Sequence, residues 1–224
     1  MSFLSHVKAI RLPALTAALI SSAMLSGCGP NGTHILNNAE YFQYTFKIAE
    51  KVANDSFRIP LCNGQHLDAS MDAIEQMIQT GNSTLTDCAQ SFAVSVDARR
   101  AEGLVEVETH GNPATTQSDL EIRLANPATA PTTTIPTSIF LRGTGPLQTG
   151  PLPGFADLGF GTAAQDVFST QQNQGAPHFF AHKMLSLSST RVSGNFSLIA
   201  KNINNANDDR VLIVTDGTYL LDVD

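Results

Sequence analysis

The strongest clue to the fold is an alternation of apolar and polar residues that begins after Ser91. In three successive segments every second residue is apolar. These apolar residues are Phe92, Val94, Val96, Val105, Val107, Leu120, Ile122 and Leu124. Because successive side chains of a strand point to opposite faces, this period of two predicts antiparallel strands with one face in water. Later segments of the same kind bring the expectation to seven or eight strands, enough for a sheet that curls into a sandwich or a partial barrel.

The residues before this region show the period of a helix. We expect a first helix capped by Asn37 or Asn38, because apolar residues then recur at spacings of three and four. That apolar face comprises Phe42, Phe46, Ala49, Ala53 and Phe57, with Tyr41, Tyr44, Ile48 and Val52 beside it. A second helix is expected from Asp68 or Ser70 to Gly81. Helices followed by strands predict an α+β fold, in which an N-terminal helix pair packs on a mainly antiparallel β-sheet.

The first residues have the composition of an export signal. Lys8 and Arg11 are the only charged residues among the first 27, and residues 12–24 are apolar or small. This stretch is shorter than the roughly 20 residues that span a bilayer, so a signal segment is favoured over a transmembrane helix. It leads into the sequence LSGC at residues 25–28, which resembles the lipobox of bacterial lipoproteins.

This resemblance implies that residues 1–27 are removed and that Cys28 receives acyl chains, palmitate among them. Residues 28–36 then form a tether. Two or three chains anchor a protein stably, because each buried CH₂ contributes about 0.8 kcal/mol. Gly29 stands where an Asp would favour retention in the inner membrane, so the outer membrane is the expected location. An ordinary secretory signal that happens to end in Cys is the alternative.

The length of the chain fits one folded domain after the tether. We expect it over residues 37–224, helical over 37–81 and β-rich over 90–224. The chain has 13 Lys and Arg against 20 Asp and Glu. This acidic balance disfavours nucleic acid and anionic surfaces as partners. The expected partners are the membrane, through the lipid anchor, and another protein of the envelope.

Three cysteines are an odd number for a protein of an oxidising compartment. If Cys28 is acylated, Cys62 and Cys88 remain, and we expect them to pair as a disulfide. Such a bond would hold the second helix against the start of the sheet. A metal site or a catalytic thiol is the alternative, but neither cysteine belongs to a C-x-x-C pair or lies in a histidine-rich segment.

Motifs for catalysis or cofactor binding are few. The sequence contains no phosphate-binding glycine loop and no G-x-S-x-G motif, so no cofactor is predicted and a hydrolase has no local signature. His178 and His182 lie four residues apart and could bind zinc together with His110, His66 or a carboxylate. No H-E-x-x-H motif supports this, and an ordinary place in the sheet is favoured for both.

Residues 143–161 are rich in Gly and Pro, yet they also carry five large apolar side chains. These are Leu147, Leu152, Phe155, Leu158 and Phe160. A purely flexible linker would not need them. Either the segment packs them on the domain as a cover, which we favour, or it presents them to a partner as a binding loop.

Three functions fit these observations. We favour a lipid-anchored protein of the cell envelope that is not catalytic and that binds or supports another envelope component. A lipocalin-like carrier of an apolar ligand is the first alternative, because the second half is rich in strands. A periplasmic hydrolase acting on glycan, lipid or peptide is the less favoured alternative.

Overall fold

The structure, a computed structural model, describes residues 39–111, 118–125, 136–160, 166–171, 179–204 and 208–224. All of them belong to one compact unit. The predicted signal segment, the lipid attachment at Cys28, the tether and His178 lie outside the described residues. Within these residues, the helices fall short of the length and apolar character that crossing a membrane requires.

Strands make up 63% of the described residues, and their pairings are antiparallel. The strands are β1 (Tyr41–Ala53), β2 (Ser56–Pro60), β3 (His66–Ala69), β4 (Gln90–Ser95), β5 (Val105–Gly111), β6 (Ser118–Ala125), β7 (Pro136–Thr144), β8 (Gly150–Pro151), β9 (Gly154–Phe160), β10 (Asp166–Ser169), β11 (Phe179–Leu187), β12 (Arg191–Asn202) and β13 (Val211–Asp222). They form one sheet in the order β3-β2-β1-β13-β12-β10-β9-β7-β6-β5, with β4 beside β1, β11 beside β12 and β8 beside β11.

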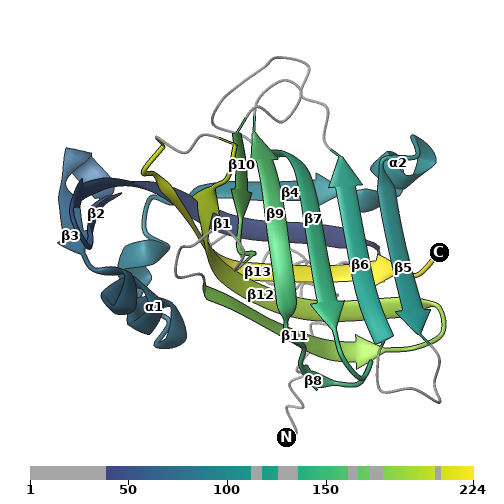
Figure 1. Cartoon of the computed structure of the whole chain (residues 1–224). Helices are drawn as coiled ribbons and strands as arrows, with labels where there is room; N and C mark the ends of the chain where they lie inside the picture. The colour runs from purple at the N-terminus through teal and green to yellow at the C-terminus, as the bar shows by residue number, and fades with distance from the viewer. Residues whose placement is uncertain (1–38, 112–117, 126–135, 161–165, 172–178, 205–207) are drawn as a thin grey trace, which may run out of the picture. The chain divides into compact units, whose positions relative to one another are not determined.

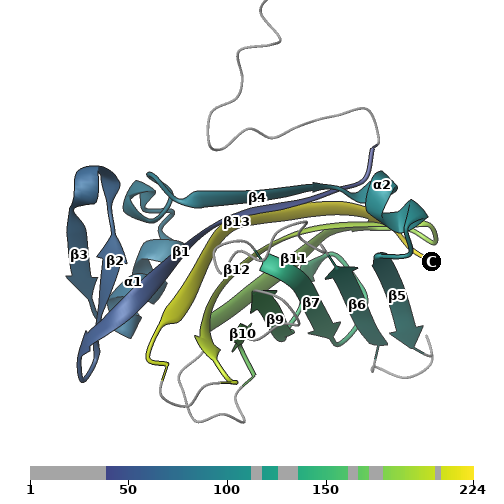
Figure 2. The same cartoon turned by 90° about the horizontal axis from the view of Figure 1, so that it is seen from above.

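This sheet turns back on itself, so that two layers face each other (Figures 1 and 2). Strands β5, β6, β7 and β9 form the front layer of Figure 1, and β4, β1, β13, β12 and β11 cross behind them. Strand β10 pairs with β9 on one side and with β12 on the other, and thereby joins the two layers. Each layer therefore has an inner face that meets the other layer and an outer face.

The main core lies between the inner faces, where aromatic rings of the two layers meet. Phe46 of β1 lies 5.9 Å from Phe160 of β9, measured between ring centroids, and Phe160 lies 5.5 Å from Phe168 of β10. Tyr44 stacks on Phe92 of β4 at 5.0 Å. All five side chains are buried. Removing such apolar surface from water, at about 25 cal/mol per Å², is the main source of stability for a fold of this kind.

The predicted α+β fold with an N-terminal helix pair is wrong, because the first of these helices is strand β1 with its hairpin partner β2. Aromatic and β-branched residues, which favour strands, fill β1. The strand is buried on both faces, and this hides its period of two. Its inner face carries Phe42, Tyr44 and Phe46, and Thr45, Lys47 and Ala49 are buried on the other.

The second predicted helix is confirmed as α1 (Met71–Gln79). The Ser70 side chain caps it by accepting a hydrogen bond from the Ala73 N–H at 3.3 Å, and Gly81, with φ of 64°, follows its end. α1 packs on the outer face of the back layer in a second core, the outer cluster. The buried members of the outer cluster are Ala49, Phe57, Ile59, Met71, Ile74, Leu85, Ile199, Val211 and Ile213.

Two smaller expectations also change. Val96, the last apolar residue of the first alternating segment, begins a short helix, α2 (Val96–Ala101), instead of continuing strand β4. Part of the Gly/Pro-rich segment 143–161 is strand β8 and strand β9, because backbone hydrogen bonds to β7, β10 and β11 are available there.

Candidate functional site

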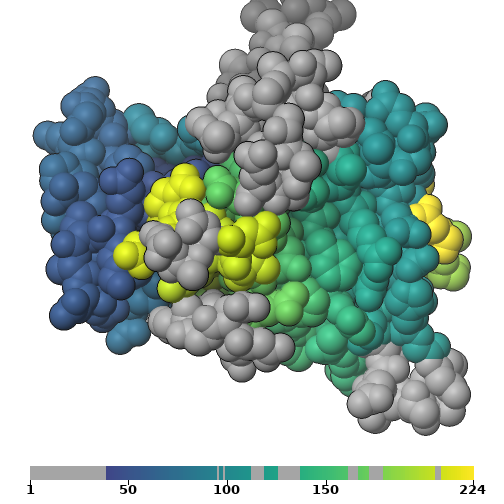
Figure 3. All heavy atoms as spheres, turned by 45° about the horizontal axis from the view of Figure 1, so that its top comes forward, coloured from purple at the N-terminus to yellow at the C-terminus, as the bar shows by residue number. Residues whose placement is uncertain are grey.

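The outer face of the front layer carries polar and aromatic side chains in register across the strands. It is part of the teal and green surface of Figure 3. One row of cross-strand neighbours runs from Glu106 through Arg123 and Phe140 to Asp157 and Ser169. Neighbouring rows place carboxylates beside guanidinium groups. This face is therefore built from side chains that hydrogen-bond and stack.

A groove runs across the strands beside this row, and small residues form its floor. Ala125 of β6, Ser138 of β7 and Gly159 of β9 are direct cross-strand neighbours. The groove measures about 350 Å³, which lies within the range of small-molecule sites. Its other lining residues are Gly103, Leu104, Glu106, Arg123, Leu124, Ile139, Phe140, Asp157 and Val167. We call it the front groove.

Phe140 supplies the aromatic wall of the front groove. The guanidinium carbon of Arg123 lies 5.4 Å from the centroid of its ring, a cation–π distance. The ring of Phe155 packs against it at 5.6 Å. Arg123 is also held by carboxylates, at 3.3 Å from Glu106 and 2.7 Å from Glu121. The wall is thus fixed by several contacts, so its side chains lose little conformational entropy when a ligand binds.

Asp157 supplies a half-buried carboxylate at the same groove. It accepts hydrogen bonds from the Ser169 hydroxyl and from the Gln171 side-chain amide, the latter at 3.2 Å. Burial raises the pKa of this carboxyl above its ordinary value, and the two hydrogen bonds oppose the shift. Glu106, Arg123 and Asp157 together offer acceptors and donors along one wall.

A cluster of two glutamates and a histidine lies on the same face, outside the groove. Ligand atoms of Glu108, His110 and Glu121 are all within 4.8 Å of one another, and this donor set suits a divalent cation. However, the Glu121 carboxylate lies 2.7 Å from a nitrogen of Arg123 and 3.6 Å from one of Arg142. Two guanidinium groups already neutralise it, so we assign no metal here.

Four of the five apolar residues of segment 143–161 contribute to the main core. Leu152, Leu158 and Phe160 are buried, and Leu147 is partly buried against them. Phe155 differs, because it lies half-buried on the outer face beside Phe140. The packed cover therefore describes the segment better than a presented binding loop.

The histidines considered for zinc do not converge within the described residues. His182 is buried on the inner face of β11, and its Nε2 lies 2.8 Å from the hydroxyl of Tyr219. Its Nδ1 is buried without a hydrogen-bond partner. Burial lowers the pKa of His182 to about 4. His110 lies on the outer face of β5, and His66 is exposed on β3.

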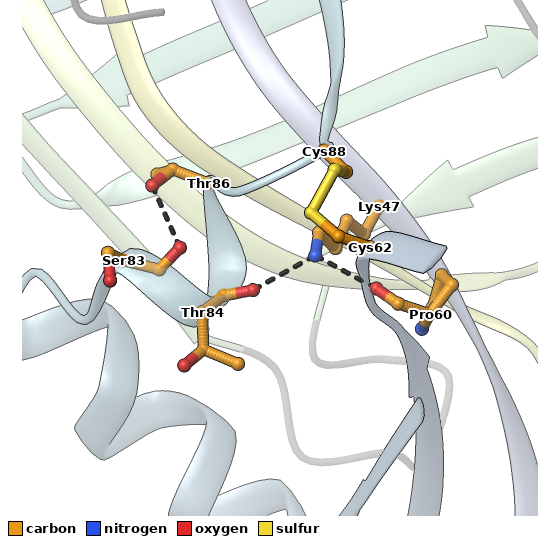
Figure 4. The surroundings of a disulfide bond; sticks show 7 residues. All are labelled: Lys47, Pro60, Cys62, Ser83, Thr84, Thr86 and Cys88. Atoms are coloured by element: carbon orange, nitrogen blue, oxygen red, sulfur yellow. Dashed lines mark hydrogen bonds between the residues drawn. A yellow bond between two sulfur atoms is a disulfide. The ribbon is translucent and has the colours of Figure 1, made fainter. Parts of the chain in front are cut away.

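Cys62 and Cys88 form the predicted disulfide, with their Cα atoms 5.5 Å apart. The bond starts at Cys62, the first residue of the 3₁₀ turn η1 (Cys62–Gly64). It ends at Cys88, three residues after the 3₁₀ turn η2 (Ser83–Leu85) (Figure 4). Buried Lys47 lies beside it and donates to the carbonyls of Pro60 at 2.8 Å and Thr84 at 2.9 Å. Burial lowers the pKa of Lys47.

The sequence did not reveal the front groove, because its floor and wall come from several strands whose side chains meet only when the strands pair. The alternation does place Glu106 and Arg123 opposite the core residues, which is a usable signal. The register that aligns them with Phe140 and Asp157 is set by the pairing of β6, β7 and β9. Comparisons of the chain with protein-family models, curated proteins and solved structures find no match.

Proposed function

We propose that this chain is a lipid-anchored, non-catalytic protein of the bacterial cell envelope that binds a glycan in the front groove. The lipobox-like sequence supports the anchor. The groove carries the binding proposal, because a floor of Ala125, Ser138 and Gly159 lets a chain-like ligand lie close to the sheet. Three strand spacings from β6 to β10 give it a length of about 14 Å, which is longer than one sugar ring.

The chemistry of the walls favours a neutral, hydroxyl-rich ligand. A sugar ring has an apolar C–H face, which Phe140 can contact, and a rim of hydroxyls, which need both donors and acceptors. Arg123 provides donors, and Glu106 and Asp157 provide acceptors. The acidic groups disfavour a polyanion. The side chains of Glu106 and Arg123 are about half exposed, so they are accessible.

The alternatives have less support. A lipocalin-like carrier needs an open space between the layers, but Phe46 and Phe160 meet there. A hydrolase has less support, because His182 is buried and bonded to the Tyr219 hydroxyl, and the exposed pair of His110 and Glu108 lies outside the front groove. We therefore favour binding over transport or catalysis.

The anchor is tested by replacing Cys28 with Ala in cells fed radiolabelled or alkyne-bearing palmitate. We expect the wild-type chain to take up label and to remain with membranes after a carbonate wash. The Cys28→Ala chain should be unlabelled and should leave the membrane fraction. Cys62→Ala serves as the control and should still be labelled. Label on the Cys28→Ala chain would contradict the lipoprotein assignment.

The groove is tested by co-sedimentation with chitin, an insoluble polysaccharide without charged groups. We expect Asp157→Asn to lower the affinity at least fivefold, because the ligand loses a charged acceptor. Asp119→Asn is the matched control, since Asp119 pairs with Arg142 on the same face outside the groove. Failure of the wild-type protein to sediment, or an equal loss in both variants, would overturn the glycan proposal and leave the anchor test unaffected.

A further inference from the structure

The outer cluster is covered by a single closed loop of the chain. The Cys62–Cys88 bond joins cysteines 26 positions apart, and the stretch between them includes β3, α1 and η2. α1 places Met71 and Ile74 on the outer face of the back layer, against Ile199 of β12 and Ile213 of β13. The loop therefore shields apolar side chains of the sheet from water. We call this stretch, residues 62–88, the cover.

Lys47 links the two ends of the cover a second time. It is 4% exposed, and its ammonium bonds the carbonyl of Pro60, just before the cover, and that of Thr84, inside its far end. Figure 4 shows the ammonium beside the disulfide, between the two turns. A buried ammonium needs such acceptors, because an unpaired buried charge is costly. The two carbonyls stay close together only while the turns are held together.

The disulfide itself is accessible to a reductant. Cys88 is exposed and Cys62 is half-buried. Cys88 also has a φ of 55°, in the left-handed region that residues other than glycine disfavour, and Asn63, next to Cys62, has a φ of 60°. Release of the bond would let both turns relax from these conformations. Exposure and backbone strain are features of labile rather than purely structural disulfides.

We propose that Lys47 and the Cys62–Cys88 bond form a redox-sensitive clasp that holds the cover over the outer cluster. A thiolate of a dithiol reductant attacks Cys88 and forms a mixed disulfide, and Cys62 leaves as a thiolate. The second thiolate of the reductant then closes its own disulfide and releases Cys88. The protein gains two electrons and two protons, and the reductant loses them. The hydrogen bonds of Lys47 still join the two turns after reduction. The cover therefore opens more often than in the oxidised protein, but less often than it would without the lysine.

Amide hydrogen exchange followed by mass spectrometry tests the clasp on the intact folded domain. The oxidised protein is compared with the same protein reduced by dithiothreitol, with both free thiols verified by mass. We expect exchange in α1 to accelerate at least tenfold on reduction, while β6 and β7 change less than twofold. An α1 rate within twofold of the oxidised protein, or an equal acceleration in β6 and β7, would overturn the proposal.

Lys47→Met tests the contribution of the lysine. While the disulfide is intact, we expect the α1 amides of this variant to exchange at most threefold faster than those of the wild type. After reduction it should exchange at least threefold faster than reduced wild type. Lys51→Met is the matched control, because Lys51 lies on the same strand and pairs with the exposed Asp209. Equal α1 exchange rates in reduced wild type and reduced Lys47→Met would show that the disulfide acts alone, and would refute the joint clasp. The wild-type comparison still decides the redox step if Lys47→Met does not fold.

Discussion

His182 couples the acidity of the medium to the stability of the sheet. Burial lowers its pKa to about 4 in the folded state, against about 6.5 in an unfolded chain. Between these values the unfolded chain binds a proton that the folded chain does not. The free energy of unfolding should therefore fall as the pH drops from about 6.5 to about 4, by roughly 3 kcal/mol from this residue.

Urea denaturation at several pH values across this window tests the coupling. His182→Gln keeps a group that can bond the Tyr219 hydroxyl but does not titrate, so we expect a flatter dependence on pH. His66→Gln, at an exposed position of β3, is the control and should retain the slope of the wild type. A His182→Gln protein that loses as much stability toward pH 4 as the wild type would contradict this assignment.

Helix α1 owes its place to the outer cluster rather than to its own propensity, since nine residues are too few for a stable isolated helix. Ile74 is fully buried there. We expect Ile74→Ala to lower the free energy of unfolding by about 3 kcal/mol, through lost burial and the cavity left behind. Gln76→Ala, on the exposed side of the same helix, should change it by less than about 0.5 kcal/mol. Thermal or urea unfolding followed by circular dichroism measures both.

The sequence predicts strands and helices well where one face is exposed to solvent and the other is buried. β5 and β6 fit this pattern, with Val107 and Ile122 facing inward. α1 was found because Ser70 and Gly81 mark its ends. β1 was missed because Ala49 packs in the outer cluster while Phe46 packs in the main core. Apolar residues are therefore buried on both faces of β1, and they do not recur at every second position. The front groove was missed for another reason, because it exists only once strand register is fixed.

At the scale of the whole molecule, Arg100 ties distant parts of the chain together. It lies on α2 and bonds Glu40, before β1, at 2.9 and 2.6 Å. It also bonds the carbonyl of Asp222 at 2.7 Å and pairs with Asp224. The Glu40 side chain is 4% exposed and also accepts a hydrogen bond from the Asp222 N–H at 2.6 Å. Removal of Arg100 therefore leaves a buried carboxylate without its guanidinium partner.

We expect Arg100→Ala to lower the free energy of unfolding by about 3 kcal/mol. Arg99→Ala provides the comparison, because Arg99 pairs with the largely exposed Glu102 and such surface pairs contribute at most about 1 kcal/mol. Chemical denaturation of both variants at neutral pH gives the two values. Similar losses in the two variants would mean that the Arg100 contacts do not hold the ends of the strands together.

The pairing of β1 with β13 places the first and last strands of the sheet side by side, and β13 also pairs with β12. The described sheet therefore lacks a central strand until β13 has been synthesised. Such high contact order makes folding slow, in the range of milliseconds to seconds. Until β13 is in place, β1 lacks one of its hydrogen-bonding neighbours and its aromatic side chains lack their core. The partly folded chain is therefore most exposed to aggregation through β1.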